Sequence, residues 1–288
     1  MKIATHSGNF HTDEIFAVAA LLKVYPNAEL VRSRESEVWQ AADIVVDVGF
    51  IYDPQIARYD HHQTGGAGKR PNGIPYASFG LVWKHYGPKL ASVDTQEIID
   101  ERLCMAIDAI DNGVEIAEYK FKGVREYSLS DYLYSFVDQA NTDKEYLNSN
   151  FMKLVGIAQE VLSNEISQAE TLVRDTNTVR EIIKNSADKR VITLPDRLEW
   201  ERAVADFPEI MFVVYPRKEG NWGVKAVGAG VGFARKKLMP DSWIEKSSDE
   251  LAAMTGVEDA LFMHRGRHLA LASTKEGAIK LAEIALNT

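Results

Sequence analysis

Polar side chains that can bind metal stand at the ends of predicted strands near the start of the chain. Hydrophobic periodicity there predicts three strands and one helix: the strands Lys2–Thr5, Ala28–Arg32 and Asp43–Val48, and the helix Asp13–Tyr25. This order is typical of a parallel sheet, in which ligands bind beyond the carboxyl ends of the strands. His6 follows the first strand, and Asp47 lies at the end of the third. The pattern therefore predicts an α/β fold with a functional site at that edge.

The remaining strand and helix signals predict two domains. Further helices are predicted over Ser78–Tyr86, Thr95–Ile110, Asp131–Ala140 and Lys144–Lys184. Later elements are the strands Arg190–Leu194, Ile210–Tyr215, Trp222–Val227, Ala260–Met263 and His268–Ala272, and the helices Arg197–Asp206, Ser248–Thr255 and Thr274–Leu286. Because 288 residues exceed the usual size of one compact core, we predict two domains. The first is a parallel-sheet α/β domain over residues 1–184. A smaller α+β domain would follow over residues 188–288, after the polar stretch NSADKR.

Composition is that of a soluble globular protein, with 45% hydrophobic and 26% charged residues. The longest nearly unbroken apolar stretch, Ile15–Leu22, is too short to span a membrane, and the first residues lack a signal-peptide pattern. We therefore expect a cytoplasmic protein without a membrane anchor. Cys104 is the only cysteine, so no intrachain disulfide can form. The formal net charge of −9 argues against a protein that coats duplex DNA, although cations bound to a nuclease would reverse the local field.

Candidate metal ligands occur in four motifs within the first 111 residues. They are His6, His11 and Asp13 in THSGNFHTDE, Asp47 in DIVVDVG, Asp60 and His61 in RYDHHQ, and Asp108 and Asp111 in DAIDNG. A mixed set of imidazoles and carboxylates without a thiolate favours Mn²⁺, with Mg²⁺ as the alternative, over structural zinc. The set is large enough for two divalent cations. Two ions about 3.5–4 Å apart can activate water and stabilise both oxygens of a phosphoryl displacement.

Each motif also has a structural interpretation. Asp13 can cap a helix while His11 lies in a surface loop, and Asp47 can be a turn residue. The apolar run in front of Asp47 favours a metal, because an unpaired buried carboxylate is costly. Asp108 and Asp111 stand three residues apart, on one side of a predicted helix, and only one of them need bind metal. We favour Asp111, with Asp108 as an orienting group or the alternative ligand.

The order of these motifs resembles the DHH phosphoesterase superfamily, whose motifs run from a His/Asp cluster, through a lone Asp and the DHH triplet, to a later Asp. More narrowly, the strings THSGNFHTDE, DVGFIYDP, RYDHHQ and DAIDNGVEI resemble the MYG1 family, also called UPF0160, and the likeness covers most of the chain. This resemblance implies a metal-dependent hydrolase with exonuclease activity and an active site in a cleft between two domains. His11 differs from the commoner superfamily pattern, which often has Asp at that place.

The resemblance further implies roles for individual residues of the first domain. Asp60 and His61 would be direct ligands within the triplet, and Asp60 would also serve catalysis. His62 would contact the scissile phosphate or lie in the second metal shell, so it is a candidate both for catalysis and for substrate binding. Asp47 or Asp111 would bridge the two ions.

A segment of the second domain, LFMHRGRHLALAS, carries candidate substrate contacts: His264, Arg265, Arg267 and His268. In DHH proteins this domain commonly contacts substrate across the cleft, and the resemblance implies the same here. Arg265 or Arg267 is the stronger candidate, because a planar guanidinium can hold a phosphate through two hydrogen bonds. The alternative interpretation is an ordinary turn with solvated cations.

Three functions agree with these observations. The leading one is a divalent-metal-dependent phosphoesterase, a 3′–5′ exonuclease on RNA or short oligonucleotides. A second is hydrolysis of a small phosphate compound such as pyrophosphate or a nucleoside bisphosphate, and a third is a metal-binding protein without enzymatic activity. Trp222, Phe233 and Trp243 are candidates for base stacking that would favour the first function. Homo-oligomerisation stays open.

Overall fold

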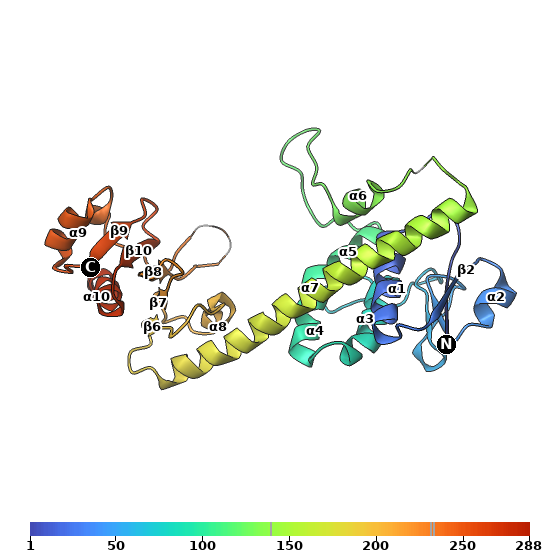
Figure 1. Ribbon diagram of the computed structural model, residues 1–288, viewed down its shortest axis with the longest axis horizontal. Coiled ribbons are helices and arrows are strands. Elements are labelled where there is room, and N and C mark those ends of the chain that lie inside the picture. The colour runs from blue at the N-terminus through green and yellow to red at the C-terminus, as the bar shows by residue number, and fades with distance from the viewer. Residues whose placement is uncertain (139, 231, 233) are drawn as a thin grey trace. The chain divides into compact units, whose positions relative to one another are not determined.

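The computed structural model describes residues 1–138, 140–230, 232 and 234–288, which form two compact units, Met1–Glu170 and Thr171–Thr288 (Figure 1). The units divide within the long helix α7, Lys144–Asn185. The boundary predicted from the polar stretch NSADKR lies at the end of this helix instead. A domain boundary after residue 184 and a cleft between the two domains stay predictions.

The first unit contains a mixed five-stranded sheet with the order β2-β1-β3-β5-β4. Its strands are β1 (Lys2–Thr5), β2 (Glu29–Arg32), β3 (Ile44–Val46), β4 (Tyr52–Asp53) and β5 (Arg58–Tyr59). The pairs β1–β2, β1–β3 and β3–β5 are parallel, whereas β4 is antiparallel to β5. The α/β class is therefore confirmed, but the sheet is not purely parallel. Periodicity missed β4 and β5 because each has only two residues.

Helices pack on this sheet and on one another. They are α1 (Thr12–Val24), α2 (Ser36–Gln40), α3 (Ser78–Tyr86), α4 (Val93–Ile99), α5 (Met105–Asp111) and α6 (Leu129–Tyr134). The segment Ile15–Leu21 of α1 is fully buried, which explains the apolar stretch in the sequence. Helix α6 ends earlier than the predicted Asp131–Ala140. No helix in the described part of the chain has both the length and the hydrophobicity of a membrane span.

The single helix predicted over Thr95–Ile110 is interrupted by one π-helical segment, Asp100–Cys104, between α4 and α5. Arg70 contacts this segment and the helix after it: its guanidinium donates to both Asp100 oxygens, at 2.8 and 2.6 Å, and lies 2.8 Å from Asp108 Oδ2. A wider turn changes the direction in which the following side chains point. Sequence periodicity alone assumes an unbroken α-helix and cannot show this.

The second unit has a five-stranded mixed sheet with the order β6-β7-β8-β10-β9. Its strands are β6 (Val191–Thr193), β7 (Phe212–Pro216), β8 (Trp222–Ala226), β9 (Ala260–Met263) and β10 (Leu269–Ala272), and its helices after α7 are α8 (Glu201–Ala205), α9 (Ser248–Thr255) and α10 (Lys275–Asn287). Among the described strands of this second sheet, β6 and β7 pair in parallel and the other neighbours are antiparallel. All five strands and three helices agree with predicted elements of the smaller α+β domain.

Candidate metal centre

Three neighbouring strands of the first sheet deliver side chains to one edge. His6 directly follows β1, Asp47 directly follows β3, and His61 comes two residues after β5. The first turn of α1 adds Asp13 and Glu14, and the last residue of α5 is Asp111. The sequence therefore builds the site from the carboxyl ends of parallel strands, together with the ends of two helices.

These side chains form three overlapping groups in which the potential ligand atoms lie within 4.8 Å of one another. The groups are His6, His11, Glu14 and Asp47; Asp47, His61 and His62; and His11, Asp13 and Asp111. Asp47 and His11 each belong to two groups, so the three groups are continuous. We call these eight residues together the His/Asp cluster. It contains imidazole and carboxylate groups and no thiolate.

Asp47 has an unusual backbone in this cluster. Its φ of 56° lies in the left-handed region, which Asp tolerates better than most residues with a side chain. Its amide donates to Tyr59 O at 3.1 Å, and its Oδ1 accepts from Ser78 Oγ at 2.9 Å. These contacts hold the carboxylate at the end of β3, where its side chain is only 1% exposed. Backbone strain of this kind is typical of functional sites.

Glu14 belongs to the cluster but was not predicted from the sequence. One of its oxygens accepts from the amide of His11 at 2.7 Å, and the other lies 3.0 Å from His6 Nε2. The spacing of His11 and Glu14, from N-cap to third helical residue, is that of a capping box, in which the acidic side chain folds back over the helix start. The capping-box spacing is the sequence signal that could have identified Glu14.

His61 lies among three carboxylates. Its Nε2 is 3.0 Å from Asp111 Oδ2, 3.5 Å from Asp47 Oδ1 and 4.0 Å from Asp13 Oδ2. The side chain is 6% exposed, so little water reaches it. A nitrogen close to three carboxylates, two of them buried, marks a place where positive charge is strongly favoured.

Several buried polar atoms of the cluster have no hydrogen-bond partner among the residues that the structure describes. They are Asp13 Oδ1, Glu14 Oε1, Asp47 Oδ2 and His61 Nε2. Leaving one buried polar atom unpaired costs about 1–3 kcal/mol. Glu14 Oε1, Asp47 Oδ2 and His61 Nε2 each lie 3.0–3.3 Å from an oppositely charged group, but the alignment of these contacts is not that of hydrogen bonds. Divalent cations would satisfy all of these atoms, so the residues present fit a metal centre.

The pKa values of the cluster point to the same charge requirement. Burial and the charges of Asp47 and Asp111 raise the pKa of Asp13 well above its usual range. Burial alone would lower the pKa of His6 and His61, but their carboxylate neighbours raise each to about 10. The cluster thus favours cationic partners, which is the condition for binding metal.

Asp60 and His62 form a pair at the exposed border of the cluster. Asp60 Oδ1 accepts from the His62 amide at 3.0 Å and lies 2.8 Å from His62 Nδ1, while Asp60 Oδ2 accepts from the Phe50 amide at 2.6 Å. The hydrogen bond with Asp60 raises the pKa of His62. The side chain of His62 is 48% exposed, against 2% for Asp60. Asp60 therefore orients His62, and it lies outside the three groups of potential ligand atoms.

Asp108 and Asp111 have different surroundings. Asp111 lies in the cluster beside His61, whereas Asp108 is fully buried, accepts from the Gly80 amide at 3.0 Å and pairs with Arg70. A side chain at Gly80 would collide with Asp108, since an added Cβ would lie 1.8 Å from its Oδ2. The structure thus brings Asp111 to the predicted centre and leaves Asp108 outside the three groups.

In the second unit, the predicted substrate contacts lie on the turn between β9 and β10. Arg267 Nε donates to Met239 O at 2.6 Å, and its guanidinium pairs with Asp241. Arg265 is exposed. His264 Nδ1 accepts from the Gly266 amide at 3.0 Å, and its ring centroid is 4.4 Å from that of His268. Arg265 is therefore better placed than Arg267 to bind a phosphate.

The three aromatic residues considered for base stacking differ in their surroundings. Trp243 is 3% exposed and belongs to the core of the second unit, while Trp222 packs against that core. Phe233 lies outside the described residues. Trp243 is thus unsuited to stacking on a base.

Comparisons with known proteins identify relatives along the whole chain. The model of an uncharacterised protein family, UPF0160, matches residues 2–286. A MYG1 protein of Dictyostelium discoideum is 27% identical, over 100% of this chain and 97% of its own length. The MYG1 exonuclease of Homo sapiens is 29% identical, over 99% of this chain and 85% of its own length, and that of Mus musculus is 29% identical over 99% and 84%.

A crystal structure of RecJ in complex with Mn²⁺ from Thermus thermophilus overlaps with a TM-score of 0.30 and 12% identity. The overlap covers 100% of this chain and 52% of that protein, so this chain spans about half of its length. A TM-score this low gives no basis for assigning the fold.

Proposed function

The chain belongs to the UPF0160 family, and we propose that it is a divalent-metal-dependent phosphoesterase that acts as an exonuclease. The observation that carries this proposal is the His/Asp cluster, whose buried carboxylate and imidazole atoms lack hydrogen-bond partners among the described residues. Relatives similar over almost the whole chain are named exonucleases, which supports the same reaction class.

The chemistry follows from the position of the cluster at the end of the sheet. Divalent cations held there would lower the pKa of an attacking water and stabilise the charge on the phosphoryl oxygens. His6, His11, Asp13, Glu14, Asp47, His61 and Asp111 would hold them. Mn²⁺ is the favoured ion and Mg²⁺ the alternative, because the donors are nitrogen and oxygen atoms without sulfur.

His62 is the side chain proposed to contact the substrate phosphate. Its Nδ1 faces Asp60, so its Nε2 is the ring atom left to meet a ligand, and nearly half of its side chain is exposed. Asp60 holds the ring in place through the amide of His62 as well as through Nδ1. His62 would therefore donate a hydrogen bond to a phosphate oxygen, while Asp60 fixes its orientation.

We propose RNA or short oligonucleotides as substrates, shortened from the 3′ end, and the cytoplasm as the place of action. RNA carrying a label on its 5′ end distinguishes the direction. Trimming from the 3′ end gives a ladder of labelled products, whereas trimming from the 5′ end releases labelled mononucleotide at once. DNA and pyrophosphate serve as parallel substrates.

The expected result is Mn²⁺-dependent conversion of labelled RNA into a ladder, with loss of activity in chelator. Full activity in chelator would contradict the metal-dependent mechanism. Cleavage of pyrophosphate without cleavage of any oligonucleotide would contradict the exonuclease assignment and favour the small-phosphate hydrolase.

Arg265→Ala is expected to raise the KM for RNA about tenfold while bound metal and the melting temperature stay unchanged, because a charge-assisted hydrogen bond to phosphate is lost. Arg197→Ala is the matched control, since Arg197 is another exposed arginine of the same unit. Arg267→Ala should instead lower the melting temperature, because Arg267 ties Met239 and Asp241 to the turn. Steady-state kinetics and thermal unfolding together measure these effects. Equal KM values for wild type and Arg265→Ala would leave Arg265 as a solvated cation.

A further inference from the structure

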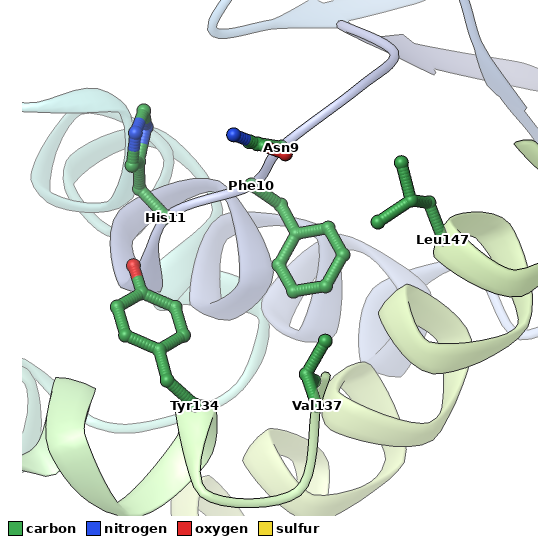
Figure 2. A pocket seen from close by; sticks show the side chains of 6 residues that line it. All are labelled: Asn9, Phe10, His11, Tyr134, Val137 and Leu147. Carbon is green, nitrogen blue, oxygen red and sulfur yellow. The ribbon is translucent and has the colours of Figure 1, made fainter. Parts of the chain in front are cut away.

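A pocket of about 230 Å³ opens beside the His/Asp cluster. Its lining, shown in Figure 2, consists of Asn9, Phe10, His11, Tyr134, Val137 and Leu147. His11 belongs to both the pocket and the cluster, so the two are directly adjacent. All six residues lie in the first unit, Met1–Glu170. If a substrate phosphate lies at the cluster, the part of the substrate attached to that phosphate could therefore enter this pocket.

The pocket has the size and the walls for one flat ring system. Pockets for drug-sized ligands are larger, at roughly 300–1,000 Å³. Three of the lining side chains are aromatic rings, Phe10, His11 and Tyr134, and the aliphatic Val137 and Leu147 lie beside Phe10 (Figure 2). The described lining contains no lysine or arginine, so it does not offer a second phosphate site. Asn9 adds an amide, which can both donate to and accept from the edge of a base.

The walls are held in place by contacts outside the pocket. Phe10 is 6% exposed and packs edge-on against Phe151, with ring centroids 5.6 Å apart. The guanidinium of Arg32 lies 5.3 Å from the centroid of Phe10. The turn after α6 is closed by a hydrogen bond from the Val137 amide to Tyr134 O at 3.0 Å. A preformed aromatic wall loses little entropy when a ligand binds.

We propose that this pocket binds the nucleobase of the nucleotide whose phosphate lies at the His/Asp cluster. The proposal rests on the proposed phosphodiester substrate and specifies which part of it the first unit recognises. Apolar and aromatic walls suit the faces of a base, and stacking is tolerant of base identity because every base has a π-face. The enzyme would thereby hold a nucleotide by its base as well as its phosphate, and would bind base-free phosphates more weakly.

The test compares binding of adenosine 5′-monophosphate and ribose 5-phosphate to the Mn²⁺-loaded full chain by calorimetry. Wild type should bind the nucleotide at least about tenfold more tightly, since only the nucleotide carries a base. Val137→Trp fills the pocket and should reduce the nucleotide affinity to that of ribose 5-phosphate, without changing the latter. Val93→Trp is the matched control, because Val93 is 69% exposed on the same unit and lies outside the pocket lining.

Equal affinity of wild type for the two ligands, or a Val137→Trp variant that keeps the full preference for the nucleotide, would overturn the proposal. Leu147→Trp, on helix α7, gives a second way to fill the pocket if Val137→Trp does not fold. The ratio of the two affinities tests base binding in the pocket even if no RNA is cleaved. Failure of the proposed exonuclease function would be seen separately, in the cleavage assay.

Discussion

Asp47→Asn is expected to remove metal-dependent hydrolysis, with a loss greater than the roughly 10–100-fold that follows removal of an outer-shell partner of a metal ligand. Asp47 is shared by two of the three groups, and its Oδ2 has no hydrogen-bond partner among the described residues. Asn keeps the side-chain shape, tolerates the left-handed backbone at this position and can still accept from Ser78 Oγ. The fold should therefore persist while the charge that attracts the cations is lost.

The measurement is bound Mn²⁺ by equilibrium dialysis together with the rate of RNA cleavage. Asp43→Asn is the matched control, because Asp43 is an exposed carboxylate just before β3. We expect the control to keep both metal and activity. An Asp47→Asn protein that binds and cleaves as the wild type does would exclude Asp47 from the metal centre.

Arg70→Met is expected to lower the free energy of unfolding by about 3–5 kcal/mol, the range observed when one partner of a buried ion pair is removed. The Arg70 side chain is 1% exposed, and Asp108 beside it is fully buried. Burial alone would lower the pKa of Arg70, but contacts with Asp100 and Asp108 raise it, so the guanidinium is charged. Without it, Asp108 would keep only backbone partners, the amides of Gly80 and Ala77, in a buried setting that already raises its pKa to about 7.

Urea unfolding of the metal-free protein at neutral pH measures this effect without interference from metal binding. Arg102→Met, in the neighbouring π-helical segment, is the control: its pair with Glu165 is partly solvated at 3.3 Å and should contribute less than about 1 kcal/mol. The double variant Arg70→Met with Asp108→Leu should recover most of the lost stability, because the uncompensated charge is gone. A loss as small for Arg70→Met as for Arg102→Met would contradict this account.

The strand ends of the first unit could be predicted because the required signal is local. His6 and Asp47 follow apolar runs directly, and parallel strands bring their carboxyl ends to one edge. His61 follows β5, a strand too short to show periodicity, so only its neighbours in the DHH triplet pointed to it. Predictions of position thus depended on the length of the strand in front of each ligand.

The choice between Asp108 and Asp111 depends on contacts that are distant in the sequence. Arg70 lies 38 residues before Asp108, and no helical pattern reveals that the two meet. The π-helical segment before α5 also changes the direction of both carboxylates relative to an unbroken α-helix. Glu14 was missed for a different reason: its capping-box spacing favours a structural interpretation, and the structure places it in the cluster as well.

The central claim is that the His/Asp cluster binds the divalent cations needed for catalysis. Anomalous diffraction from crystals of the full chain soaked in Mn²⁺ tests it most directly. The account predicts Mn²⁺ peaks among His6, Asp13, Asp47, His61 and Asp111, with none at the Arg70–Asp108 pair. Crystals of a protein that cleaves RNA with Mn²⁺ but shows no peak in this cluster would contradict it.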